Sequence, residues 1–349
     1  MGKCYINGIG SVSIQSLDYT IYEGTPTVLQ HRNTAVHPDY KAFIPAGMLR
    51  RMASGVKMGI FAARQAMQDA DQQNLDAIIT GTSLGCLQDS EKFLDAMIEN
   101  QEEYLTPTSF IQSTHNTVAA QIALQLPSKA YNFTYVNGGN SFEAALFDGL
   151  QQIHTEEAQN ILVGGLDETA PQFDHLFQLA GNYKTPDAAI DFQKPKTAGL
   201  PVGEGANFFI LTNQQTENTY AELLDVHLFN CPRIHAEAEI EEFLSYHGLD
   251  RNSIDVLVLG YNADQQQQSF MDEYAVLFPN TPQAYYQHLS GAFDTASAYG
   301  LKVACEVLRQ QELPKQLQYN QIKPIRLKHI LLISQSRGTD YSFVLLRSC

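Results

Sequence analysis

A chain of 349 residues with 44% hydrophobic content can bury one or two cores of ordinary size. Its formal net charge of −16 argues against nucleic acid as a partner, because phosphate binding requires clustered lysines and arginines. No run of about 18 uncharged apolar residues occurs, so we expect no membrane span. The first residues, MGKCYINGIGSVSI, predict a strand rather than a signal peptide.

The cysteines and histidines predict neither disulfides nor a metal site. The five cysteines are widely separated and odd in number, and no Cys or His spacing suits zinc. We therefore expect reduced thiols in a cytoplasmic protein, with no metal or other cofactor. Cys86 is expected to be a buried or incidental thiol, since no histidine lies near it in sequence.

In chain order, the first half alternates between strands and helices. Short apolar runs predict buried strands, and longer segments with apolar residues at helical spacing predict helices. The expected strands are residues 77–80, 133–136, 161–163 and 207–211, and the expected helices are residues 50–69, 89–100, 118–126 and 141–154. This alternation predicts an α/β fold with mostly buried strands.

The second half repeats the theme. Strands are expected at residues 255–259, 329–334 and 341–346, and helices at residues 267–277 and 295–309. The polar stretch TNQQTEN, residues 212–218, marks the expected junction. We therefore expect two similar α/β halves, residues 1–214 and 219–349.

The stretch YNFTYVNGGNSFEAALFDGLQQI, residues 131–153, predicts a strand that turns sharply into a buried helix. Many enzymes mount a nucleophile on such a turn. The tip of this turn, Asn137-Gly138-Gly139-Asn140, carries glycine instead of a reactive side chain. We call these four residues the elbow.

Six short segments carry a resemblance to one family. They are Arg50-Arg51-Met52 with Ala62-Ala63, Gly81-Thr82-Ser83-Leu84-Gly85, Asn132-Phe133-Thr134-Tyr135, Gly164-Gly165-Leu166-Asp167, Gly203-Glu204-Gly205-Ala206 and His288-Leu289-Ser290-Gly291-Ala292. In this order they are similar to segments of the β-ketoacyl synthases, the condensing enzymes of the thiolase fold. The resemblance spans nearly the whole chain. It implies a thiolase-like fold of two similar βα halves, with helices between and around mixed sheets.

The resemblance places the family's catalytic cysteine on Gly139, and counting from either Gly164 or Asn132 gives this register. Condensing enzymes load an acyl group onto a cysteine thiolate at a helix N-terminus and stabilise an enolate with two histidines. Glycine cannot accept an acyl group, so covalent catalysis at Gly139 is excluded. Ser141 is a weaker candidate nucleophile, because no base lies beside it in sequence and a serine here satisfies helix N-terminal N–H groups.

The resemblance also implies the positions of the other catalytic groups. The first histidine falls on Gly260 or Tyr261, in LVLGYNADQ, and neither residue can replace it. The second histidine is retained as His288, while the family's lysine five residues before it is Gln283. The family's C-terminal glycine-rich loop looks reduced to Ser336-Arg337-Gly338-Thr339-Asp340. As a condensing enzyme on its own, this chain is expected to be inactive.

Three functions remain open on this basis. The first is a silent partner of an active ketosynthase, similar to the chain-length factors of type II polyketide synthases and to short ketosynthase-like proteins of aryl-polyene and flexirubin pathways. The second is a slow malonyl-carrier-protein decarboxylase that uses His288 and backbone donors. The third is an acyl-binding or assembly protein, which would form a homodimer without a cognate synthase. We rank the silent partner first and the decarboxylase second.

One basic cluster stands out against the acidic background. Arg50, Arg51 and Lys57 could dock an acidic carrier protein, although a solvated helix face is the simpler interpretation. A surface at −16 repels an acidic carrier over a Debye length of about 8–10 Å. Contact with acyl carrier protein is therefore expected mainly through the partner subunit.

Overall fold

The computed structural model describes residues 2–231 and 235–349 of the chain. Its strands are β1 (Tyr5–Val12), β2 (Ala77–Gly81), β3 (Tyr131–Tyr135), β4 (Asn160–Asp167), β5 (Gly205–Thr212), β6 (Ala221–Asn230), β7 (Val256–Leu259), β8 (Gln283–Tyr285), β9 (His329–Ser336) and β10 (Asp340–Arg347). These ten strands form one hydrogen-bonded sheet in the order β3-β2-β4-β5-β1-β6-β10-β9-β7-β8.

The strand order contains an internal repeat. Each strand of the first half corresponds to the strand numbered five higher in the second half, from β1 with β6 to β5 with β10. The pairing directions repeat as well. β2 runs parallel to β3 and β4, as β7 does to β8 and β9. β5 runs antiparallel to β1 and β4, as β10 does to β6 and β9. The two halves are thus similar α/β units joined where β1 meets β6.

Helices cover and separate the strands. They are α1 (Ala46–Leu49), α2 (Ser54–Asp69), α3 (Leu87–Glu99), α4 (Pro107–Ser113), α5 (Thr117–Gln125), α6 (Ser141–His154), α7 (Pro171–Leu179), α8 (Ala236–Tyr246), α9 (Gln268–Ala275), α10 (Gln287–Ser290) and α11 (Ser297–Gln310). Short 3₁₀ helices are η1 (Tyr40–Ala42), η2 (Gly138–Asn140), η3 (Arg251–Ser253) and η4 (Lys315–Leu317). No helix of the described residues is long and apolar enough to cross a membrane.

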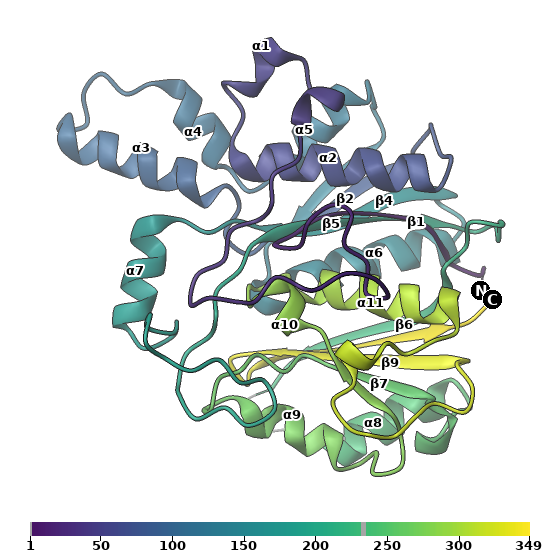
Figure 1. Cartoon of the computed structure of the whole chain (residues 1–349). Coiled ribbons are helices and arrows are strands. Elements are labelled where there is room, and N and C mark those ends of the chain that lie inside the picture. The colour runs from purple at the N-terminus through teal and green to yellow at the C-terminus, as the bar shows by residue number, and fades with distance from the viewer. Residues whose placement is uncertain (1, 232–234) are drawn as a thin grey trace.

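The elements stack in layers, with α6 and α11 between the strands of the two halves (Figure 1). Three apolar clusters follow this layering. One joins α6 and α11 to strands of both halves. A second joins α2 and α5 to strands of the first half, and a third joins α8 and α9 to strands of the second half. α6, in the middle layer, packs against β2 and β4, and the elbow lies at its N-terminus.

Most of the expected elements are present. The helix expected over residues 141–154 is α6, with the same bounds. The helix expected over residues 50–69 begins later, at Ser54 of α2, and is preceded by the separate short helix α1. The polar stretch expected as a junction, residues 212–218, begins with Thr212, the last residue of β5, and continues in the loop between β5 and β6. β6, α7 and α8 were not expected, and all three contribute to the core or to the site.

Candidate functional site

The elbow is held by its own backbone and by Ser141. The Ser141 hydroxyl donates to the carbonyl oxygen of Gly138 at 2.7 Å and accepts from the Asn137 N–H at 2.8 Å. A Cβ atom on Gly81 would lie 2.2 Å from the Ser141 carbonyl oxygen, so only glycine lets α6 begin directly against the end of β2. The weaker candidate nucleophile, Ser141, is fully buried and closes the turn.

The side-chain position of Gly139 is filled from the C-terminal hairpin of β9 and β10. A Cβ atom on Gly139 would lie 2.3 Å from Cβ of Ser336, a distance that real Cβ atoms essentially never show. The Gly139 N–H donates to Oδ2 of Asp340 at 3.2 Å, and the other oxygen of Asp340 accepts from Asn230 at 2.6 Å. The elbow therefore has room for no side chain and directs its N–H at a carboxylate.

A buried carboxyl lies in the first turn of α6, the helix that follows the elbow. Glu143 is fully buried, and its Oε1 accepts from the Ser342 hydroxyl at 3.0 Å. Burial raises the pKa of Glu143 to about 7, and the nearby Asp340 carboxylate adds to the rise. α6 is thus tied to β10 through Glu143 and through the elbow.

A cavity of about 910 Å³, part of it open to solvent, lies beside Gly139. Its walls combine apolar, uncharged polar and charged side chains. The apolar wall includes Leu84, Leu87, Phe173, Phe177 and Phe293, and the polar wall includes Asn262, Gln267, Gln287, Ser334 and Gln335. The Arg337 guanidinium, also on the lining, sits 5.8 Å from the ring centre of Phe177. We call this space the elbow cavity.

Asp167 joins several of the quoted segments at the base of the elbow cavity. Its Oδ1 accepts from the Thr82 hydroxyl and from the N–H groups of Ser83 and Leu84, at 2.9–3.0 Å. Its Oδ2 accepts from the N–H and the hydroxyl of Thr295, in the other half, at 3.2 and 2.9 Å. Burial and the neighbouring Asp294 raise the pKa of Asp167 to about 6. Asp167 thus joins the two halves.

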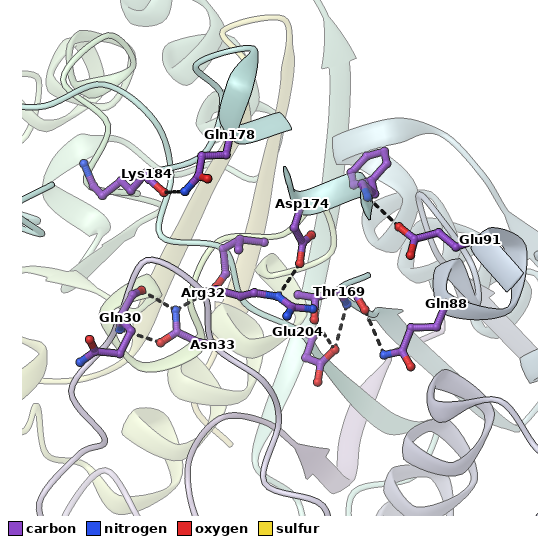
Figure 2. A network of polar contacts seen from close by, with 12 residues as sticks. Gln30, Arg32, Asn33, Gln88, Glu91, Thr169, Asp174, Gln178, Lys184 and Glu204 are labelled. Atoms are coloured by element: carbon purple, nitrogen blue, oxygen red, sulfur yellow. Dashed lines mark hydrogen bonds and ion pairs between the residues drawn. The ribbon is translucent and has the colours of Figure 1, made fainter. Parts of the chain in front are cut away.

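Two buried glutamates organise the surrounding loops. Glu168 accepts from the N–H of Gly55 at 2.6 Å and of Gln88 at 2.8 Å, and so caps the N-termini of α2 and α3 together. Burial raises the pKa of Glu168 to about 7, although these two hydrogen bonds act to lower it. Glu204 accepts from the Ala35 N–H at 2.9 Å and from the N–H and hydroxyl of Thr169, as Figure 2 shows in part.

The rim of the elbow cavity at α7 is fixed by polar contacts from two segments (Figure 2). Arg32 Nε donates to Oδ2 of Asp174 at 2.7 Å, and the Asp174 side chain is only 8% exposed. The Phe173 N–H donates to Glu91 at 2.6 Å. These contacts hold Phe173 and Asp174 on the cavity lining.

The positions expected for the lost first histidine and lysine do not line the elbow cavity. Tyr261 is buried, donates to Asp272 at 2.8 Å and stacks on Tyr319 with ring centres 4.2 Å apart. Gly260 faces the Tyr286 hydroxyl, 3.3 Å from where its Cβ would be. The Gln283 side-chain amide donates to the carbonyl oxygens of Ala275, the last residue of α9, and of Phe278, three residues further on. It thereby fixes the C-terminal end of α9. None of the three lines the cavity.

His288 also lies outside the elbow cavity. Its ring packs on Tyr285 at 4.0 Å between centres and lies edge-on to Phe192 at 6.1 Å. Burial lowers the pKa of His288 to about 4, so the ring is neutral at physiological pH. The preceding residue, Gln287, lines the cavity in its place.

The remaining candidate residues are dispersed. Arg50 and Arg51 are exposed between α1 and α2, and Lys57 is partly buried on α2. Cys86 is fully buried at the start of α3. Burial, followed by the charges of Glu168 and Asp89, raises the pKa of this thiol well above its ordinary value. Among the described residues, no group of three or more His, Cys, Asp or Glu side chains is placed to hold a metal ion.

Ser336 and Asp340 contact the elbow in a way that sequence reasoning missed. The sequence placed both in the reduced glycine-rich loop but gave no sign that they contact Gly139, about 200 positions earlier. The missing signal is tertiary, since it depends on the β9–β10 turn reaching the elbow.

Known proteins share this fold. A family model described as beta-ketoacyl synthase, N-terminal domain, matches residues 25–198. The ishigamide ketosynthase/chain length factor superposes with a TM-score of 0.84 at 16% identity, over 100% of this chain and 99% of that one. A β-ketoacyl synthase from Burkholderia phymatum STM815 gives 0.82 at 16% identity, with both chains fully covered.

A third similar structure is a complex. The ketosynthase ApeO with its chain length factor ApeC, from Xenorhabdus doucetiae, gives a TM-score of 0.79 at 16% identity, over 100% of this chain and 98% of that one. No curated protein sequence matches the chain. The duplicated α/β architecture with a strand–elbow–helix at its centre defines a thiolase-fold protein of the ketosynthase class. With the family-model match, the chain belongs to the β-ketoacyl synthase family.

Proposed function

We propose that this protein is a catalytically silent subunit, of the chain-length-factor type, that pairs with an active ketosynthase of fatty-acid or polyketide biosynthesis, in a pathway of the aryl-polyene kind. The observation that carries the proposal is the occupied elbow. Gly139 offers no nucleophile, and Ser336 fills the space that a side chain there would need.

The electrostatics of the elbow argue in the same direction. Acyl transfer needs N–H donors aimed at an oxygen that becomes negative in the transition state. The Gly139 N–H is already donated to the Asp340 carboxylate. A second anionic oxygen at this place would meet the charge of Asp340, so the elbow disfavours the chemistry as well as lacking the thiol.

The partner is proposed to dock on the edge formed by β3. β3 is the first strand in the sheet order, and no other described strand pairs with its outer side. Tyr131 and Phe133 are each 45% exposed and Val136 is 52% exposed, and the rings of Tyr131 and Phe133 stack 6.1 Å apart. An open edge with exposed aromatic side chains is unfavourable in a lone subunit and suits strand addition by a partner.

The similar structures and the charge balance support a ketosynthase as the occupant. One of them is a ketosynthase held in complex with its chain length factor. An acidic carrier protein is disfavoured by the net charge of −16, and the exposed Arg50 and Arg51 offer only a local exception. We therefore assign carrier docking mainly to the partner and pairing to this chain, as a dimer in the cytoplasm.

No observation favours the decarboxylase. It would rely on His288, whose ring packs on aromatic side chains outside the elbow cavity. The test of pairing is the native mass of the chain co-expressed with an active ketosynthase from the same organism. A one-to-one heterodimer is the expected result. A homodimer that persists beside an unpaired ketosynthase would instead favour an assembly or acyl-binding protein.

A further inference from the structure

A second cavity lies beside β1 and is lined by residues of α2 and α11. Figure 1 shows where these three elements lie in the fold. It measures about 990 Å³ with its open mouth and shares no lining residue with the elbow cavity. Its walls come from β1 and the segment after it, the C-terminal half of α2, Tyr220 and α11. We call it the β1 cavity.

One wall of the β1 cavity carries an ion pair on α11. Lys302 Nζ lies 2.9 Å from Oε1 of Glu306, and the two side chains are only 14% and 23% exposed. The other carboxylate oxygen of Glu306 is buried without a hydrogen-bond partner in the described part of the chain. A pair this buried adds little to stability, because desolvation offsets its attraction. Its placement on a cavity wall points to a role in binding.

The opposite wall presents polar groups in fixed positions. Oδ2 of Asp69 accepts from the Ile9 N–H at 2.9 Å and from the Tyr220 hydroxyl at 2.8 Å. Oε1 of Gln65 accepts from the Ser11 N–H at 3.1 Å, which orients the amide. A carboxylate and an amide held by the backbone in this way are ready to accept from and donate to a ligand.

The charges of the β1 cavity restrict the class of ligand. Two carboxylates face one lysine, which disfavours an anion. Two of the three tyrosine rings on the lining, Tyr220 and Tyr299, which could attract an ammonium group, are already occupied by cations. Lys302 lies 5.1 Å from the ring centre of Tyr299, and Arg309 lies 4.3 Å from that of Tyr220. A neutral molecule that both donates and accepts hydrogen bonds fits these constraints.

We propose that the β1 cavity binds a small neutral polyhydroxylated molecule of the sugar or polyol class. Its hydroxyl groups donate to Asp69 and accept from Lys302 and from the Gln65 amide. This site is separate from the elbow and from the proposed pairing edge, so it does not depend on the proposed function. It gives the subunit a binding site for a small molecule besides its partner.

The test is ligand-observed NMR and calorimetry on the full chain. The probes are D-glucose, myo-inositol and glycerol, with putrescine and inorganic phosphate as charged comparisons. The expected result is saturable binding of at least one neutral probe, weakened at least tenfold by Lys302→Met. Gln68→Trp, on an exposed lining residue, narrows the cavity without touching the ion pair and is expected to weaken binding to a similar extent. Arg337→Gln, on the elbow cavity, is the matched control and should change the affinity less than twofold.

Other outcomes would overturn the inference. Binding of putrescine or phosphate in preference to every neutral probe would show that the class is wrong. If none of the neutral probes binds, or if Gln68→Trp binds one as well as the wild type does, the β1 cavity is not a polyol site. The Gln68→Trp result stands even where Lys302→Met fails to fold.

Discussion

The backbone N–H of Gly139 donates to Oδ2 of Asp340 over 3.2 Å, a contact between residues 201 positions apart in the chain. The same hairpin brings Cβ of Ser336 to 2.3 Å from where a Cβ on Gly139 would stand. The strand, turn and helix of the elbow are thus present, and the position that the sequence comparison assigns to the family's nucleophile is filled from the other half of the molecule.

The filled elbow predicts that a cysteine cannot simply be restored. Gly139→Cys should lower the free energy of unfolding by about 1–3 kcal/mol, because the new side chain overpacks against Ser336. Gly139→Cys with Ser336→Gly should recover most of this loss. Urea unfolding of the three proteins measures the effect. Gly47→Cys is the control, since a Cβ on Gly47 meets nothing within 4 Å. Equal cost at positions 47 and 139 would show that Ser336 does not fill the elbow.

Glu143 predicts a pH dependence of stability. Its pKa is raised from 4.5 to about 7 in the folded chain, so the native state binds more protons than the unfolded state between these values. The contribution of Glu143 to the free energy of unfolding is therefore fully present below about pH 4.5. It is lost as the pH rises through about 7, and the total loss is about 3 kcal/mol.

Glu143→Gln removes this titration. The free energy of unfolding of the variant should rise relative to that of the wild type as the pH rises from 5 to 8. Chemical unfolding at each pH measures the difference. Glu157→Gln, on an exposed glutamate, is the control and should run parallel to the wild type. A constant difference between Glu143→Gln and the wild type over this range would contradict the buried, protonated carboxyl.

Replacing Asp167 is expected to destabilise the fold strongly, although Asp167 has no catalytic role in the proposed function. Asp167→Ala leaves five hydrogen-bond donors of the two halves without their acceptor. We expect a loss of about 3 kcal/mol or more in the free energy of unfolding, because unpaired buried donors are costly. Thermal or urea unfolding measures it, with Asp187→Ala on an exposed aspartate as control. A loss of stability no larger than that of the control would contradict the claim that Asp167 holds the two halves together.

If the partner docks on the β3 edge, a charged substitution there should weaken the complex. Phe133→Asp should weaken the complex with the ketosynthase at least tenfold, because it places a charge in an apolar contact. Analytical ultracentrifugation of the mixture gives the dissociation constants. Ile325→Asp changes an even more exposed apolar residue in the segment before β9 and should leave the affinity within twofold. If the two variants behave alike, pairing does not use β3.

The sequence predicted the strand–turn–helix around the elbow well, because a β-branched and aromatic run, a glycine turn and a helical apolar period follow one another there. β6 escaped prediction since its ten residues mix charged and apolar side chains without a clean alternation. α8 was not predicted because its four glutamates obscure the helical spacing of its three large buried apolar residues, Ile240, Phe243 and Leu244.

The site was less predictable than the fold. His288 and Gln287 are neighbours on a four-residue helix, where one step turns the side chain by about 100°. Which of the two faces the elbow cavity depends on the packing of Tyr285 and Phe192 around His288, and no local pattern encodes it. The contact of Ser336 with Gly139 is likewise set by the meeting of the two halves.

The most direct measurement is a condensation assay with radiolabelled malonyl- and acyl-carrier protein, run with the purified chain alone and with its ketosynthase. A silent partner predicts product only in the mixture and no label retained on this chain. Product, or a covalent acyl label, from the chain alone would reveal a nucleophile other than residue 139 and would contradict the account.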